Sequence, residues 1–258
     1  MSMKFDEDTA KKMDALYQSQ DAKKRRRAVV DALRLKSGER VLDIGTGLGH
    51  LALEMAELTG PTGEIMGIDL NGSMLAYARN RCQAFPSIQF SIADAGKLPF
   101  DDNSFDVAVS VQVYEYIKDT DQVLKEMHRV LKPGGRGLIV ATDWKAPIWY
   151  SADQQRMQKV LTAWEEHCAH SDLPRVLNPQ LRQAGLSIKS QAVILQFNTT
   201  LNPDAYSFHI IGIMKNFVQG RNGVTQKEAE EWANELYTLS ENEAYFFCLN
   251  QFLFLLTK

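Results

Sequence analysis

VLDIGTGLGH, residues 41–50, is the stretch that decides the fold: an apolar run with one aspartate breaks into glycines at Gly45, Gly47 and Gly49. A helical pattern begins directly after it. Glycine has no Cβ, and the first N–H groups of a helix have no partner inside the helix, so such a turn lets a ligand approach bare backbone. Dinucleotides, phosphates and other adenosine compounds all bind in this way. The loop therefore predicts a ligand site and leaves the ligand open.

The sequence after the loop predicts the fold class. Short apolar runs alternate with amphipathic stretches from Val41 onward, which is typical of crossover units around a parallel sheet. Five strand units are expected up to about residue 142, and the helix over 120–135 is expected to end at its proline and glycines. Two more strands, 186–199 and 244–258, bring the expected sheet to seven. We therefore expect an α/β protein with a doubly wound, seven-stranded sheet.

The chain reads as one domain over 1–258, because no low-complexity linker or repeat divides it. Within it we expect N-terminal helices over 1–37, a ligand-binding core over 38–145 and a mostly helical insertion over 202–242. The insertion includes a capping-box pattern that starts at Thr225. Since it lies between the last two strands, it is predicted to form a cap on the sheet.

Composition limits the class of partner. The 29 basic and 32 acidic side chains leave a net charge of -3, which provides no field to gather nucleic acid or an anionic membrane. The start, MSMKFDEDTAKK, lacks the apolar core of a signal peptide, and no stretch is apolar for long enough to cross a bilayer. Cys82, Cys168 and Cys248 show no pairing or metal spacing. We therefore expect a cytoplasmic protein with no metal site and no nucleic-acid or membrane partner.

One interpretation of the loop is a nicotinamide dehydrogenase. Asp69 ends the second strand 20 residues after Gly49, where a ribose-binding carboxylate belongs. The glycines, however, follow G-x-G-x-G rather than G-x-G-x-x-G, so the third glycine falls one residue early for the dinucleotide fingerprint. The spacing therefore argues against a nicotinamide cofactor.

Motifs spread over the core carry a resemblance to a known family. VLDIGTGLGH is followed by GIDLN at 67–71, IADAGKLPFDDNSFDVAVS at 92–110 and LKPGG at 131–135. In order and spacing these resemble the class I S-adenosylmethionine-dependent methyltransferases, in the group of ubiquinone/menaquinone C-methylases and small-molecule methyltransferases. The resemblance implies a Rossmann-like methyltransferase fold with a mostly parallel sheet and an antiparallel last strand. It also implies S-adenosyl-L-methionine as cofactor and in-line methyl transfer to a small, partly apolar metabolite.

The same resemblance implies a cofactor site. In that site the backbone around Gly45 and Gly47 packs against the amino acid part, Asp69 accepts hydrogen bonds from both ribose hydroxyls, and Asp94 accepts one from the adenine amine. The helices over 1–37 are implied to cover the cofactor. The residues assigned to this site are Tyr17, Arg26, Asp43, Gly45, Thr46, Gly47, Gly49, His50, Asp69, Leu70, Met74, Asp94, Ala95, Val111 and Gln112.

Some of these residues have a second explanation. Asp43 either bonds the cofactor's ammonium through water or braces the glycine turn. Arg26, in the basic run KKRRR at 23–27, either reaches the methionine carboxylate, as in similar methyltransferases, or lies on a solvated helix face. His50 is a cofactor neighbour and a weak base candidate, because a helix N-terminus disfavours imidazolium.

Candidates for the acceptor site follow the fourth and fifth strands, because ligands sit beyond the carboxyl ends of such sheets. Tyr114 and Tyr116 lie in VQVYEYIKD, and Asp143 lies in TDWKAPIWY. With His209 of the cap, these residues are the catalytic candidates. Each has an alternative explanation as an ordinary core or surface residue. A general base is needed only if the acceptor keeps its proton near neutral pH.

The cap has an apolar helix face between Tyr206 and Phe217. This face either packs against the sheet or a partner chain, which would make a homodimer, or lines an apolar pocket for the small-molecule methyl acceptor. The methylated atom, carbon, oxygen or nitrogen, stays open. The alternative functions are a non-catalytic cofactor-binding or regulatory module and, against the acidic composition, a nucleic-acid or protein methyltransferase.

Overall fold

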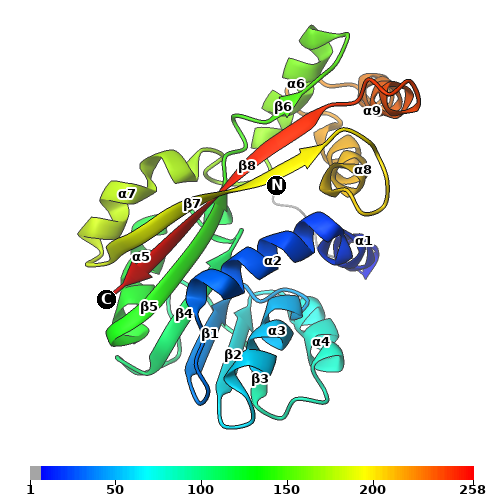
Figure 1. Ribbon diagram of the computed structural model, residues 1–258. Coiled ribbons are helices and arrows are strands. Elements are labelled where there is room, and N and C mark those ends of the chain that lie inside the picture. Colours follow the sequence, from blue (N-terminus) through cyan, green and yellow to red (C-terminus); the bar gives the residue numbers. More distant parts are fainter. Residues whose placement is uncertain (1–6) are drawn as a thin grey trace.

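The computed structural model describes residues 7–258, and their side chains from Lys12 onward. Strands and helices alternate along the core, and further helices, at the start of the chain and in its C-terminal half, cover that core (Figure 1). In chain order the elements are α1 (Glu7–Gln18), α2 (Gln20–Leu33), β1 (Arg40–Ile44), α3 (His50–Thr59), β2 (Glu64–Asp69), α4 (Gly72–Arg81), β3 (Ile88–Ile92), β4 (Phe105–Val111), η1 (Tyr114–Tyr116), α5 (Thr120–Val130), β5 (Leu131–Thr142), β6 (Ile148–Trp149), α6 (Gln154–Glu165), α7 (Leu173–Gln183), β7 (Ser187–Asn198), α8 (Tyr206–Val218), α9 (Gln226–Glu241) and β8 (Phe247–Thr257).

One mixed sheet organises the described chain. Its order is β3-β2-β1-β4-β5-β8, and both β7 and the short β6 also pair with β8. The first five strands in this order are parallel, whereas β8 is antiparallel to β5, β6 and β7. The predicted doubly wound, mostly parallel sheet with an antiparallel last strand is therefore confirmed. The two-residue strand β6 was not predicted, because so short an apolar run has no period to detect.

The helix before β5 is shorter than predicted. It ends at Val130, and Leu131 takes extended backbone angles and pairs with Phe105 of β4. LKPGG thus opens the strand β5 instead of closing the helix. The reason is Pro133, which disfavours helical angles at the residue before it and cannot donate to the preceding turn.

Each face of the sheet is covered by its own helices. Val41 of β1 packs with α2 and α3, where Met55 is buried, while Leu42 and Ile44 face the opposite cluster that includes α5 and α7. Alternate residues of a strand point to opposite faces, so β1 is apolar on both. The carboxyl ends of β1, β2 and β4 are therefore held between two packed layers.

A third cluster forms the cap. The long strands β7 and β8 extend past the parallel sheet and carry α6, α8 and α9 at that end (Figure 1). Trp164 of α6, Met214 of α8 and Trp232 of α9 are buried together. The helices α8 and α9 correspond to the insertion over 202–242, and the capping box at Thr225 is present in full.

The N-terminal helices are tied to the cap. The helix α8 has no side-chain cap of its own, and the carboxylate of Asp21 in α2 accepts the backbone N–H of Tyr206 at 2.8 Å instead. The same Oδ2 accepts a hydrogen bond from the amide of Asn198 at 2.7 Å. An acidic group at a helix N-terminus is stabilising, so Asp21 joins α2, β7 and α8. None of the described helices is apolar over the length that a bilayer crossing needs.

Candidate functional site

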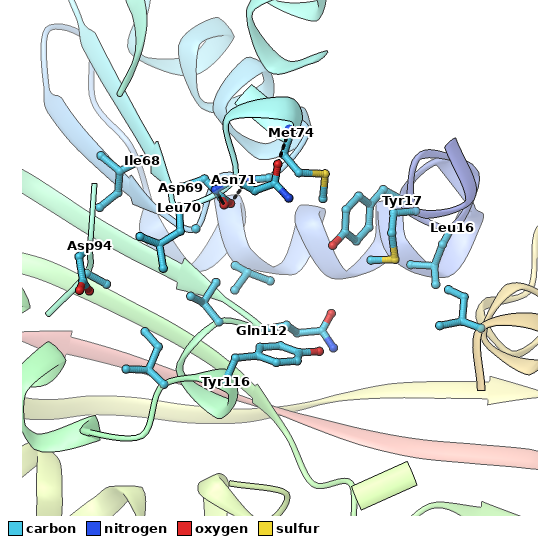
Figure 2. A pocket seen from close by; sticks show the side chains of 18 of the residues that line it. Leu16, Tyr17, Ile68, Asp69, Leu70, Asn71, Met74, Asp94, Gln112 and Tyr116 are labelled. Atoms are coloured by element: carbon cyan, nitrogen blue, oxygen red, sulfur yellow. Dashed lines mark hydrogen bonds between the residues drawn. The ribbon is translucent and has the colours of Figure 1, made fainter. Parts of the chain in front are cut away.

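A cavity of about 870 Å³ opens at the carboxyl ends of the parallel strands. Its wall comes from the glycine loop and the ends of β2, β3 and β4 on one side, and from α1, α6 and α8 on the other. Figure 2 shows Asp69 and Asp94 at one side of this space, with Tyr17, Gln112 and Tyr116 around its middle. The cavity therefore lies between the core and the elements that cover it.

The glycine loop forms part of the cavity wall. Gly45 and Gly47 line it, with φ angles of +72° and +54°, which residues other than glycine rarely adopt. The N–H groups of Gly45 and Thr46 donate to the carbonyl of Ile68 at 2.8 and 2.9 Å, so the loop is anchored to β2. A Cβ on Gly45 would lie 2.3 Å from a Val113 methyl, whereas one on Gly47 would meet nothing within 4 Å. Gly47 thus presents open backbone to the cavity.

Asp69 lies at the end of β2 and lines the cavity beside the loop. Its Oδ2 accepts the N–H of Gly47 at 3.1 Å, and its Oδ1 accepts the N–H of Asn71 at 2.8 Å (Figure 2). Burial raises the pKa of this carboxyl above its usual value, and the backbone bonds oppose the rise. Each carboxylate oxygen has two lone pairs, so further hydrogen bonds to a ligand fit.

The wall next to Asp69 contains both polar and apolar side chains. Asp94 lines it at the end of β3, where its Oδ1 accepts the N–H of Gly96 at 2.8 Å. Leu70 also lines the cavity and leaves 69% of its surface accessible, which is unusual for leucine. Met74 and Ala95 also line this part of the cavity.

Asp43 and Thr46, both assigned to the cofactor from the sequence, do not line the cavity. They bond to each other, with the Thr46 hydroxyl donating to Asp43 Oδ2 at 2.7 Å. Burial raises the pKa of Asp43 to about 7. Of the two explanations for Asp43, the geometry favours bracing of the turn. Gly49 also lies behind the wall, where a Cβ would come within 2.9 Å of Ala78.

His50, predicted as a cofactor neighbour, is not among the residues that line the cavity and bonds to an N-terminal helix instead. Its Nε2 lies 2.9 Å from Oδ1 of Asp14 in α1, and the guanidinium of Arg81 lies 2.6 Å from the same oxygen. Burial and the charge of Arg81 lower the pKa of His50 to about 4, so the ring is neutral near pH 7. Burial opposes ionisation of Asp14, yet its bonds to His50 and Arg81 outweigh it and hold that pKa below its usual value. This cluster fastens α1 to α3 and α4.

Arg26 is also engaged within the protein. Its Nε donates to Glu54 at 2.6 Å and its Nη1 to the backbone carbonyl of Tyr17 at 2.6 Å, so the predicted reach to a methionine carboxylate is not what the structure has. The neighbouring Arg25, which the sequence did not single out, donates from Nη1 to the side chain of Gln112 in the cavity wall. The two arginines differ only in the direction in which their side chains leave α2.

Gln112 is held in an uncommon conformation at the end of β4. Its φ is +55°, a left-handed angle that costs free energy for a residue with a side chain. Its amide accepts from Arg25 and donates to the Thr142 hydroxyl at 2.8 Å. The amide is thus fixed at both ends while Gln112, like the preceding Val111, lines the cavity.

Tyr114 and Tyr116 have opposite environments within the short helix η1. Tyr116 lines the cavity, whereas Tyr114 is fully buried in the core beneath the sheet. Burial raises the pKa of the Tyr114 phenol, whereas Tyr116 leaves 41% of its surface exposed. Tyr114 as a catalytic candidate is therefore corrected to a core residue.

Asp143 and His209 also lie away from the cavity wall. Asp143 accepts from Nε of Arg175 at 2.9 Å and from the N–H of Lys145 at 3.2 Å, so it anchors the loop after β5. Nε2 of His209 donates to the carbonyl of Pro203 at 2.7 Å, which closes the turn before α8. Both are corrected from catalytic candidates to structural residues.

The side of the cavity under the cap is apolar and aromatic. Trp144 and Trp164 line it, with ring centroids 5.7 Å apart. The remaining contributors from α1 and α8 are Met13, Leu16, Tyr17, Tyr206, Ile210 and Ile213. None of these residues from α1 and α8 has a charged side chain. Trp144 belongs to TDWKAPIWY, the stretch after the fifth strand that the sequence indicates as part of the pocket. No signal in the sequence marks Trp164, because the helix positions around it have the pattern of ordinary amphipathic packing.

Comparison with known proteins identifies the family. A family described as "Methyltransferase domain" matches residues 35–234. The chain belongs to this family. The ubiquinone/menaquinone biosynthesis C-methyltransferase UbiE of Pseudomonas putida (strain GB-1) is 42% identical over 118 residues, 45% of this chain and 46% of that protein. An uncharacterised 37.1 kDa protein in transposon TN4556 of Streptomyces fradiae is 34% identical over 132 residues, 51% of this chain and 38% of that protein. The chain thus matches less than half the length of these relatives.

Solved structures share the fold over most of this chain. One, a putative methyltransferase from Bacillus halodurans, has a TM-score of 0.65 at 18% identity and covers 90% of this chain and 98% of its own. A phosphoethanolamine N-methyltransferase from Haemonchus contortus, solved with S-adenosylhomocysteine, has a TM-score of 0.64 at 19% identity and covers 98% and 58%. The [4+2]-cyclase SpnF has a TM-score of 0.62 at 22% identity and covers 92% and 81%. Identities this low show the fold alone.

Metal ligands do not gather in the described residues. No group of three or more histidine, cysteine, aspartate or glutamate side chains in residues 12–258 has a geometry that could hold a metal ion.

Proposed function

We propose that this protein is an S-adenosyl-L-methionine-dependent methyltransferase that acts on a small acceptor with an apolar part. The observation that carries the proposal is one cavity with two chemically distinct sides. One side combines the open backbone of Gly47 with the carboxylate of Asp69, and the other is aromatic and aliphatic. Family membership and the S-adenosylhomocysteine bound in the Haemonchus enzyme support the same assignment.

The residues on the first side suit the cofactor. Gly45 and Gly47 let its amino acid part approach the loop backbone. The lone pairs that remain on Asp69 suit the paired ribose hydroxyls. Leu70 offers an exposed apolar face for the adenine ring, and Asp94 offers a carboxylate to its amine. When bound, the cofactor supplies a methyl group on positively charged sulfur.

The residues on the second side suit an apolar acceptor. Trp144, Trp164 and Ile210 exclude water and position a ring or chain by packing. Tyr116 lies between the two sides, where a π face next to a sulfonium is favourable. No carboxylate or imidazole contributes to the cap side of the described cavity, so the chain's main contribution is positioning.

The test is binding followed by turnover. Titration calorimetry with S-adenosyl-L-methionine and with S-adenosylhomocysteine is expected to give dissociation constants on the order of 1 μM. Mass spectrometry should then detect S-adenosylhomocysteine with at least one member of a panel of phenols, amines and carbon acids. Binding without product from any acceptor would favour a non-catalytic cofactor-binding module, and absence of binding would remove the proposal.

The partners and the location stay predictions. A small-molecule acceptor is supported by the apolar cavity side, whereas a cytoplasmic location, the lack of nucleic-acid and membrane partners, and a homodimer rest on the sequence alone. A gel-shift titration with RNA at low salt and a sedimentation run would test two of them.

A further inference from the structure

Arg25 is a buried cation without a counterion in contact. It lies on α2 with 3% of its surface exposed, its Nη1 donates to Gln112, and its Nε has no partner. No ion pair links it to a carboxylate of the described residues, whereas Arg26 next to it pairs with Glu54. A guanidinium does not give up its proton in proteins, and an uncompensated buried charge is costly. A ligand with negative charge would relieve that cost.

The groups around Arg25 belong to the cavity wall. Tyr17 of α1, Gln112 at the end of β4 and Tyr206 of α8 all line it. Glu115 of η1 and Arg26 on the same helix are the other charged groups that act on Arg25. Glu115 is fully buried, its Oε1 accepts the N–H of Thr142 at 2.9 Å, and burial raises its pKa to about 7. It is therefore a weak counterion near neutral pH.

The positive charge of Arg25 acts on the pKa values of two phenols in this wall, Tyr206 and Tyr17. Burial raises the pKa of Tyr206 to about 12; the charge of Arg25 is the largest influence opposing that rise, whereas Glu115 adds to it. Burial also raises the pKa of Tyr17, and Arg25 again opposes it most. Arg25 thus offsets part of the cost that burial imposes on a phenolate at this wall.

The space beside these groups suits a ring. Trp144, Trp164, Ile210 and Ile213 form its apolar walls, and no carboxylate or imidazole lines that side of the described cavity. An acceptor hydroxyl held there has no base in contact. Its ionisation then depends on the electrostatic environment, which Arg25 makes favourable.

We infer that Arg25 is a specificity-determining residue that selects a phenol or enol and favours its reaction as the oxyanion. This inference rests on the proposed function. The acceptor's ring packs between the tryptophans and α8, its oxygen faces Tyr206 and Gln112, behind which Arg25 lies, and its proton leaves to solvent. The oxyanion's electron pair then forms the bond to the methyl carbon while the carbon–sulfur bond breaks and its pair stays on sulfur. The products are a methyl ether and a neutral thioether, so charge balances.

The test uses 4-nitrophenol, whose phenolate and phenol forms absorb at different wavelengths. The probe is titrated with pH in the complex with S-adenosylhomocysteine, for the wild type, Arg25→Met, Arg25→Lys and a control, Arg27→Met. Arg27 lies on the same helix with an exposed side chain paired to Asp31. The bound probe should ionise at least about one pH unit below the free probe in the wild type and the control. The shift should shrink in Arg25→Lys and vanish in Arg25→Met.

Three results would overturn the inference. The wild-type complex fails to bind the probe, or it binds the probe without changing the probe's pKa, or the pKa shift remains in Arg25→Met. A tenfold loss of S-adenosylhomocysteine affinity in Arg25→Met, with the probe's titration unchanged, would assign Arg25 to the cofactor's carboxylate instead. If the wild type does not bind S-adenosylhomocysteine at all, the proposed function fails, which separates the two failures. Circular dichroism confirms that each variant is folded.

Discussion

The two sides of the cavity are built by different means. On the cofactor side, backbone geometry dominates: glycines at positive φ, strand ends and carboxylates that accept backbone N–H groups. On the cap side, side chains from α1, α6 and α8 make an apolar wall with no comparable backbone feature. Backbone sites demand particular residues at particular spacings, whereas an apolar wall accepts many residues of similar volume. The comparison explains why the cofactor is recognisable in this sequence and the acceptor is not.

The sharpest way to break the cofactor side is Gly45→Ala. The left-handed φ of +72° and a Cβ only 2.3 Å from Val113 act together. We expect a loss of about 3 to 4 kcal/mol in unfolding free energy, from backbone strain and overpacking. The matched control is Gly47→Ala, with φ +54° and open space, where strain alone should cost about 1 to 2 kcal/mol. Urea denaturation of both variants measures the difference, and equal losses would contradict the steric explanation.

The second prediction concerns Glu115, which is fully buried in η1 next to the cavity residue Tyr116. Its pKa in the folded state is about 7, above the ordinary 4.5, so the folded state binds this proton more tightly than the unfolded chain. Its contribution to stability is therefore full below pH 4.5 and is lost as the pH rises through about 7. Glu115→Gln keeps the acceptor for the Thr142 N–H and removes the titration.

Relative to the wild type, Glu115→Gln should gain up to about 3 kcal/mol in unfolding free energy at pH 8 compared with pH 4.5. Urea denaturation at both pH values gives this difference, with Glu57→Gln on the surface of α3 as the control. If the unfolding free energies of the wild type and the variant change in parallel with pH, Glu115 is already ionised below pH 7.

The third prediction tests the carboxylate of the cofactor side. Asp69→Ala removes the acceptor proposed for both ribose hydroxyls and leaves the N–H of Gly47 without its partner. Hydrogen bonds to a charged group contribute about 1.5 to 3 kcal/mol each, so affinity for S-adenosylhomocysteine should fall on the order of 100-fold. Calorimetry measures it, with the exposed Asp31→Ala as the control. Unaltered binding in Asp69→Ala would disprove the proposed cofactor geometry.

How much the sequence predicts follows the same division. The sheet and the capping box at Thr225 were predictable, because periodicity and turn residues determine them locally, whereas the antiparallel last strand was implied by the family resemblance. The cavity positions of Gly47, Asp69 and Asp94 followed from motif spacing. Each of these features depends on backbone that a few neighbouring residues specify.

The remaining site residues depend on rotation and on partners distant in the chain. Successive residues of a helix differ in direction by about 100°, so KKRRR does not tell whether Arg25 or Arg26 faces inward. Likewise, Tyr114 and Tyr116 differ only in which side of η1 they occupy. His50 has a partner, Asp14, that lies 36 residues away in the chain, and no local pattern reveals such a pair.

The smallest expected effect on cofactor binding comes from the cap. Ile210 and Ile211 are adjacent on α8 and both are buried, but only Ile210 lines the cavity. Ile211→Val should cost about 1 kcal/mol of stability by loss of a packed methylene, and Ile210→Val should cost less because its side chain borders open space. If the two sides act independently, calorimetry should give S-adenosylhomocysteine affinities within about twofold of the wild type for both variants. Only Ile210→Val should then alter the acceptor's KM. A fivefold or larger change in cofactor affinity for Ile210→Val would show that α8 contributes to the cofactor side, and the division of the cavity would have to be redrawn.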